Sequence, residues 1–180
     1  MIECCAGHRR GVARLTYCIL GDWTGGQMAR IRVFYSYSHE DAKYRQRLEI
    51  HLSVLRRQGL IDEWHDRKIL AGHDWRDEID QHLEQSDIIL LLVSASFIAS
   101  DYCYGREMKR AIELHEDGRA TVIPVIIRCV NWTGLPFSEL QALPADGRPV
   151  AKWHDQEEAW TQITQGIRDT VADLKQRVAT

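Results

Sequence analysis

Along most of the chain, short apolar runs alternate with segments in which apolar residues recur every three or four positions. The runs have the length and flanks of buried strands, and they cover residues 31–37, 60–64, 87–93, 121–127 and, more briefly, 149–153. The periodic segments predict helices at residues 40–58, from 75 to 83, after residue 107 and from 160 to 174. Strands that alternate with helices indicate βαβ units and an α/β fold. We predict a flavodoxin-like, doubly wound sheet of five parallel strands in the order 2-1-3-4-5.

The amino-terminal segment differs from the rest of the chain. Residues 1–27 lack sustained periodicity and end in a stretch rich in glycine and polar residues, and Met28 follows directly. We therefore expect residues 1–27 to be a disordered extension outside the fold, with Met28 as the natural start. A length of 180 residues is enough for one domain with a substantial core, and we expect residues 28–176 to form it.

The composition is that of a soluble globular protein, with 44% apolar and 27% charged residues. A net charge of −3 gives no general attraction for nucleic acid or anionic lipid, so we expect neither nucleic acid nor a membrane as a partner. No apolar run approaches the roughly 20 residues of a membrane span. The five cysteines are an odd number and form no CxxC pair, which favours the reducing cytoplasm over an oxidising compartment.

Several kinds of chemistry are missing from the sequence. Residues 36–41, after the first strand, contain no glycine, so they form no backbone cradle for a pyrophosphate or a flavin phosphate. A phosphorelay receiver needs a phosphorylatable aspartate after its third strand, where Ser94 stands. The eight histidines have no spacing typical of a metal site, and the serine-hydrolase motif GxSxG does not occur. We expect neither a metal nor a cofactor.

The segment from Ser94 to Glu107 is the strongest candidate for a functional site. It leaves the carboxyl end of a central strand as a polar loop rich in serine and tyrosine, and it leads Glu107 into the first turn of a helix. Ligands of open α/β sheets bind at this edge. The helix dipole keeps a first-turn carboxylate ionised, but acids are common there because they stabilise helices, so a catalytic and a structural role are both open. An exposed acid at this position would contribute little to stability.

Several stretches of sequence carry a family resemblance. Residues 32–41 (RVFYSYSHED) and 65–75 (HDRKILAGHDW) resemble the first-strand signature and the BB loop of Toll/interleukin-1 receptor (TIR) domains. Residues 87–107 look like the third strand of these domains and the motif that follows it. Residues 123–127 and 143–150 are similar to the bacterial branch of the family. The resemblance covers residues 30–174, and TIR domains have a flavodoxin-like fold.

The resemblance implies one of two functions. Many bacterial and plant TIR domains, and one animal type, hydrolyse NAD⁺ at the bond between nicotinamide and ribose, and some make cyclic ADP-ribose signals. We therefore expect an NAD⁺ glycohydrolase of bacterial immune defence or signalling. It would bind NAD⁺ as its substrate, self-associate through BB-loop contacts between TIR domains and respond to a separate sensor protein. The alternative is a non-catalytic TIR–TIR interaction module, as in animal receptors and adaptors.

The resemblance also implies roles for individual residues. The catalytic glutamate of the enzymatic members maps to Glu107. The implied substrate-binding residues follow the first strand, lie in or beside the BB loop, or precede the glutamate: Tyr37, Ser38, His39, Asp66, Lys68, Gly72, Trp75 and Tyr102. Trp75 could stack on a base, although its spacing favours the core. Tyr102 could stack on nicotinamide or pack down on the sheet.

The spacing before Glu107 departs from the family pattern. Many members read Trp-Cys-x-x-Glu, whereas here Tyr102 replaces the tryptophan and Glu107 comes four residues after Cys103. An offset of one residue rotates a helical side chain by about 100°. Either the helix begins later here, which Gly105 permits, or Glu107 points away from the site.

Overall fold

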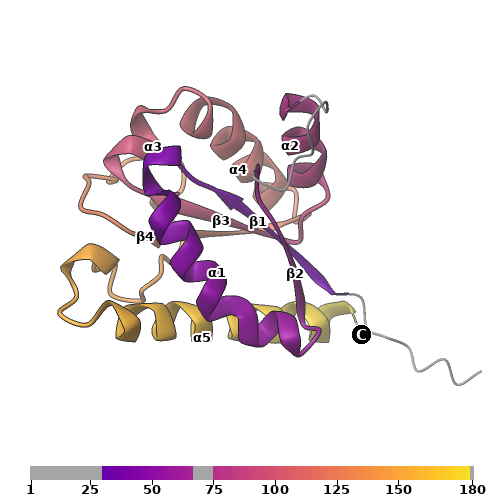
Figure 1. Cartoon of the computed structure of the whole chain (residues 1–180). Coiled ribbons are helices and arrows are strands. Elements are labelled where there is room, and N and C mark those ends of the chain that lie inside the picture. The colour runs from indigo at the N-terminus through magenta and orange to yellow at the C-terminus, as the bar shows by residue number, and fades with distance from the viewer. Residues whose placement is uncertain (1–29, 67–74, 179–180) are drawn as a thin grey trace, which may run out of the picture.

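The structure is a computed structural model that describes residues 30–66 and 75–178. Residues 1–27, for which we expected a disordered extension, lie outside the described residues. Four parallel strands form one sheet in the order β2-β1-β3-β4, with helices on both faces (Figure 1). The α/β class and the doubly wound arrangement are therefore confirmed.

The strands follow the apolar runs of the sequence closely. They are β1 (Ile31–Ser36), β2 (Ile61–Trp64), β3 (Ile88–Val93) and β4 (Thr121–Ile126). β3 lies between β1 and β4 and all six of its residues are buried, which explains why it reads as an uninterrupted apolar run. Pro124 lies in β4, the last of the four strands, where a residue without an N–H group is tolerated.

The prediction of a fifth strand at residues 149–153 is wrong, because these residues contain a 3₁₀ turn, η4 (Val150–Lys152). The place beside β4 is taken by Leu143, which forms an isolated parallel bridge with Val125. Two backbone hydrogen bonds of 2.8 Å join Leu143 to β4. Pro144 follows at once and has no N–H group to donate, so the ladder does not continue.

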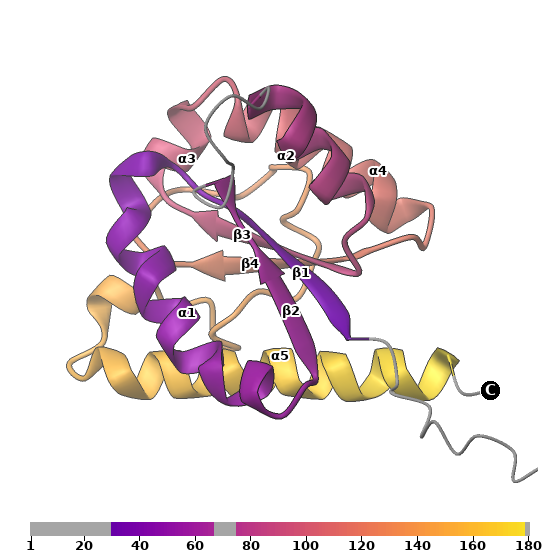
Figure 2. The same ribbon diagram turned by 45° about the vertical axis from the view of Figure 1, so that its right-hand side comes forward.

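Helices cover both faces of the sheet (Figure 2). On one face lie α1 (Ala42–Arg57) and α5 (Gln156–Val178). On the other lie α2 (Trp75–Glu84), α3 (Ala95–Ala99) and α4 (Lys109–Glu116). Among the described residues, no helix combines the length and the apolar character that crossing a bilayer requires.

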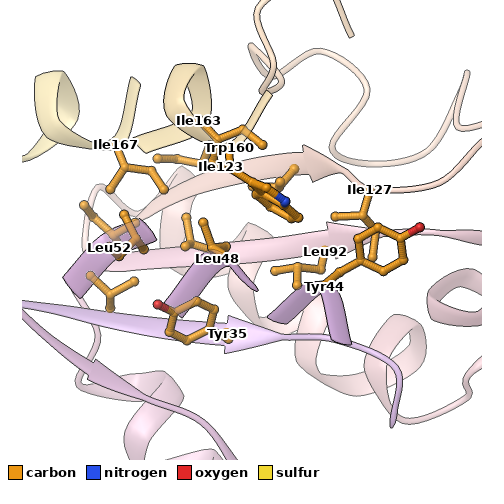
Figure 3. Packing of buried hydrophobic residues seen from close by; sticks show 14 of the residues in the cluster. Tyr35, Tyr44, Leu48, Leu52, Leu92, Ile123, Ile127, Trp160, Ile163 and Ile167 are labelled. Atoms are coloured by element: carbon orange, nitrogen blue, oxygen red, sulfur yellow. The ribbon is translucent and has the colours of Figure 1, made fainter. Parts of the chain in front are cut away.

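The larger core lies between the sheet and the pair α1 and α5 (Figure 3). Trp160 and Ile163 of α5 and Leu48 of α1 pack there with Tyr35 and Leu92 of the sheet, and each is at most 2% exposed. Alternate residues of the same strands face a second core under α2, α3 and α4. Burial of one large apolar side chain stabilises a fold by about 1.5–3 kcal/mol. The two cores thus fix the positions of the residues that follow the strands.

Candidate functional site

A pocket of about 160 Å³ opens where β1 ends. Its walls come from β1 and the residues that follow it, from the residues after β2, from helix α2 and from the segment between α3 and α4. Six of the residues that the sequence suggested for the site line it: Tyr37, Ser38, His39, Asp66, Tyr102 and Glu107. The structure therefore brings together side chains from both halves of the chain at the edge of the sheet where ligands of this fold class bind.

Three further residues suggested by the resemblance cannot be placed in the pocket. Lys68 and Gly72 belong to residues 67–74, which lie outside the described part of the chain. Trp75 is the first residue of α2, and its side chain also lies outside that part.

Glu107 lies in a π-helical turn, η3 (Cys103–Met108), and not in the first turn of an α-helix as expected. Its backbone N–H donates to the carbonyl of Tyr102 five positions earlier, at 3.2 Å, and α4 begins only at Lys109. A π turn closes its hydrogen bond over one residue more than an α turn does. The turn therefore absorbs the extra residue between Cys103 and Glu107, and the carboxyl group reaches the pocket.

The carboxyl group of Glu107 is buried, because the whole residue is only 6% exposed. The hydroxyl of Ser36, the last residue of β1, donates a hydrogen bond to its Oε2 atom. Burial raises the pKa of Glu107 to about 8, the hydrogen bond from Ser36 opposes this rise, and the carboxylates of Asp66 and Asp80 add to it. The expectation of an exposed carboxylate that the helix dipole keeps ionised is therefore wrong, since desolvation is the larger effect.

Asp66 is held in place by two residues that follow β1. The hydroxyl of Tyr37 donates a hydrogen bond of 2.7 Å to Oδ1 of Asp66. Nδ1 of His39 lies 3.5 Å from Oδ2 of the same carboxylate, and the side chain of Asp66 is only 14% exposed. The residues after β1 and after β2 are thus tied together beside the pocket.

Tyr102 and Cys103 form the wall next to Glu107. Tyr102 lines the pocket and also packs against the second core. The sequence had suggested either a place beside the ligand or packing on the sheet, and Tyr102 does both. Burial raises the pKa of the Cys103 thiol to about 11, and the thiol lies 3.4 Å from the backbone carbonyl of Tyr37. Cys103 is therefore a protonated residue that joins the π turn to the end of β1.

Sequence reasoning missed Arg45, which packs against the ring of Tyr37, a residue that lines the pocket. This residue of α1 is 3% exposed, and its guanidinium carbon lies 5.7 Å from the centre of the Tyr37 ring. Its Nη1 atom is 3.0 Å from Nε2 of His65 and also contacts the carboxylate of Glu49. The available signal was the position of Arg45, three residues before Leu48 on the inward face of the helix.

A second polar cluster fixes the loop between β3 and α3. Asp41 is fully buried and accepts a hydrogen bond of 2.5 Å from the hydroxyl of Ser94. Nη1 of Arg128 lies 3.2 Å from the other oxygen of Asp41. Ser94 also caps α3, because its hydroxyl oxygen accepts from the N–H of Phe97 at 3.0 Å. None of these four residues lines the pocket, so their role is to hold its surroundings.

The described residues include no group of three or more histidine, cysteine, aspartate or glutamate side chains that could hold a metal ion. What the pocket offers is a buried carboxyl group, a second carboxylate with hydrogen-bond donors around it, and aromatic rings. These groups can bind hydroxyl groups and stabilise a positive charge.

Comparisons with known proteins identify the family. A family model described as the TIR domain matches residues 33–169. An uncharacterized protein of Sinorhizobium fredii, y4lF, is 53% identical over 137 residues, which are 76% of this chain and 42% of the relative. The chain thus spans about two fifths of the length of that curated relative.

A solved structure is also similar to this chain. The TIR domains of the activated Roq1 resistosome that directly recognizes the pathogen effector XopQ are 18% identical, with a TM-score of 0.48, and the match covers 83% of this chain and 97% of that one. The family match extends over three quarters of the chain and includes every described residue of the pocket. This chain belongs to the TIR domain family.

Proposed function

We propose that this TIR domain cleaves NAD⁺ between nicotinamide and ribose, with Glu107 as the catalytic carboxylate. The observation that carries the proposal is the buried carboxyl group of Glu107, which opens into the pocket at the end of β1. Burial raises the pKa of this carboxyl group, and carboxyl groups with strongly shifted pKa values are typical of functional sites.

One carboxylate is sufficient for this reaction. When the C–N bond breaks, its electron pair moves to the pyridinium ring, so nicotinamide leaves as a neutral molecule and needs no general acid. The ribosyl group passes through an oxocarbenium-like state, whose positive charge the carboxylate of Glu107 stabilises. Water then forms a bond to the ribosyl carbon and loses a proton, which yields ADP-ribose. Capture by another nucleophile of the substrate would give a cyclic product instead.

The size and lining of the pocket favour the nicotinamide riboside end of NAD⁺. Its volume of about 160 Å³ is smaller than the roughly 300–1,000 Å³ that encloses a whole drug-sized ligand. The ring of Tyr102 can stack on nicotinamide, and the carboxylate of Asp66 can accept hydrogen bonds from ribose hydroxyls. Ser38, His39, Lys68, Gly72 and Trp75 are the further residues that we propose for substrate contact.

We place this activity in bacterial immune defence or signalling in the cytoplasm. The domain would act when it self-associates through its BB loop, in response to a separate sensor protein. NAD⁺ is the substrate in this proposal, and no cofactor is required.

A non-catalytic TIR–TIR interaction module is the alternative. One observation favours it, namely that Ser36 already satisfies one oxygen of a carboxyl group that is almost fully buried, as it would for a structural acid. In that case the pocket would need to bind no substrate.

Release of nicotinamide from NAD⁺ separates the two functions. Purified protein at high concentration is incubated with NAD⁺ between about pH 6 and pH 9, and the products are resolved by chromatography. We expect Glu107→Gln to lower the rate by about 10²-fold or more. The control is Glu116→Gln, an exposed residue at the end of α4. If the wild-type protein releases no nicotinamide at any pH, the interaction module is the correct function.

A further inference from the structure

We propose that Ser36 is a positioning residue, which holds Oε2 of Glu107 so that Oε1 is the oxygen presented to the substrate. This inference rests on the function proposed above. The hydroxyl of Ser36 donates to Oε2, whereas among the residues that the structure describes none forms a hydrogen bond with Oε1. Ser36, which does not itself line the pocket, thus makes the two carboxyl oxygens of Glu107 different from each other.

The residues on both sides of this contact are held in buried, packed segments. Ser36 is the last residue of β1, is 1% exposed, and lies opposite Leu91 in the ladder with β3. On the other side, Met108 follows Glu107 and is fully buried in the second core. The hydrogen bond therefore joins two fixed points, and it selects one orientation of the side chain between them. A reacting group held in one orientation gains rate because it need not find that orientation in each turnover.

The hydroxyl of Ser36 is also the group that makes ionisation of Glu107 less costly. The other titratable or charged groups near the carboxyl group come from the end of β2, from α2 and from the π turn itself: Asp66, Asp80, Tyr102, Cys103 and Arg106. The two aspartates raise the pKa of Glu107, and Arg106 is paired with Asp80. Ser36 acts in the opposite direction, since its donor favours the charged form.

A series of substitutions at Ser36 tests the proposal. Ser36→Ala removes the donor, Ser36→Cys leaves a weak one and Ser36→Thr keeps a hydroxyl. We expect kcat for nicotinamide release to fall by about tenfold or more in the alanine variant, with a smaller change in KM. The midpoint of its pH–rate profile should move to higher pH, the cysteine variant should lie in between, and threonine should restore activity. Ser53→Ala, at a half-buried position of α1 that does not line the pocket, is the matched control.

A second measurement does not depend on activity. The carboxyl carbon of Glu107 is followed by ¹³C NMR across pH, and its signal is assigned by its loss in Glu107→Gln. We expect the titration midpoint to be higher in Ser36→Ala than in wild type. If wild type releases no nicotinamide, the proposed function fails and the catalytic part of this inference fails with it. If wild type is active while Ser36→Ala shows an unchanged kcat, pH profile and carboxyl titration, the role of Ser36 alone is overturned.

Discussion

Tyr37 and Asp66 are joined by a hydrogen bond of 2.7 Å from the tyrosine hydroxyl to the carboxylate, beside the candidate pocket. Tyr37 follows β1 and Asp66 follows β2, so the contact ties together the ends of two neighbouring strands. In the proposed reaction Asp66 binds the ribose, and the hydrogen bond from Tyr37 fixes the position of the Asp66 carboxylate.

Tyr37→Phe removes this hydrogen bond and keeps the ring. We expect KM for NAD⁺ to rise several-fold, on the scale of about 0.5–1.5 kcal/mol for one hydrogen bond, with a smaller effect on kcat. Steady-state kinetics of nicotinamide release measure both constants. Tyr104→Phe is the control, because Tyr104 lies in the π turn but does not line the pocket. Equal KM values for the two variants would contradict the role of Tyr37.

The raised pKa of Glu107 predicts how activity depends on pH. The proposed mechanism needs the carboxylate form, and in the free protein this form becomes abundant only above about pH 8. We therefore expect kcat/KM to increase with pH and to level off above that value. The pyridinium ring of bound NAD⁺ favours the charged carboxylate, so kcat should rise at lower pH than kcat/KM. Profiles with no rise in this range would refute the assignment of Glu107.

The same pKa predicts how Glu107 affects stability. Its pKa in the unfolded chain is near the usual 4.5, and in the folded protein it is about 8. Between these values the folded state binds more protons than the unfolded state, so the free energy of unfolding falls as pH rises. Below the lower value the stability linked to Glu107 is fully present.

Glu107→Gln, which cannot ionise, should therefore be more stable than wild type at alkaline pH, by an amount on the order of a few kcal/mol above about pH 8. The advantage should shrink towards pH 4.5. Thermal unfolding of both proteins at several pH values measures this difference. Glu116→Gln should show no such trend, and parallel curves for Glu107→Gln and wild type would rule out the raised pKa.

Arg128 provides a test outside the pocket. It lies 3.2 Å from Asp41, which is otherwise held by the hydroxyl of Ser94 and is fully buried. Arg128→Ala leaves a buried carboxylate without its cation, and we expect a loss of about 1–3 kcal/mol in the free energy of unfolding. Urea denaturation measures this loss. Arg57→Ala, at the exposed end of α1, is the control, and a midpoint equal to that control would argue against the cluster.

The sequence predicted the sheet well because most residues of β1, β3 and β4 are buried, so these strands read as apolar runs. The uninterrupted apolar run at residues 88–93 is typical of a buried strand. The carboxyl ends of parallel strands lie at one edge of the sheet, and six predicted site residues line one pocket there. The fifth strand failed for a different reason. Leu143 pairs with β4 because it lies next to Val125 in the folded protein, and Pro144 stops the pairing there. The pattern of apolar and polar residues does not show which segment will lie beside β4.

The electrostatic environment of Glu107 could not be read from the chain. Its spacing suggested an exposed acid in a first helical turn, and burial beside Ser36 comes only from the packing of β1 against the π turn. Arg45 was overlooked for a similar reason, because its burial and its contact with the ring of Tyr37 arise only from tertiary packing.

The π turn has a consequence for how relatives of this chain are found. A sequence pattern that requires a glutamate three residues after the cysteine does not match this protein, because Glu107 comes four residues after Cys103. Its carboxyl group nevertheless lines the pocket at the carboxyl end of β1. Searches that allow one inserted position there, together with a serine at the close of the first strand, would gather sequences that fixed-interval patterns discard.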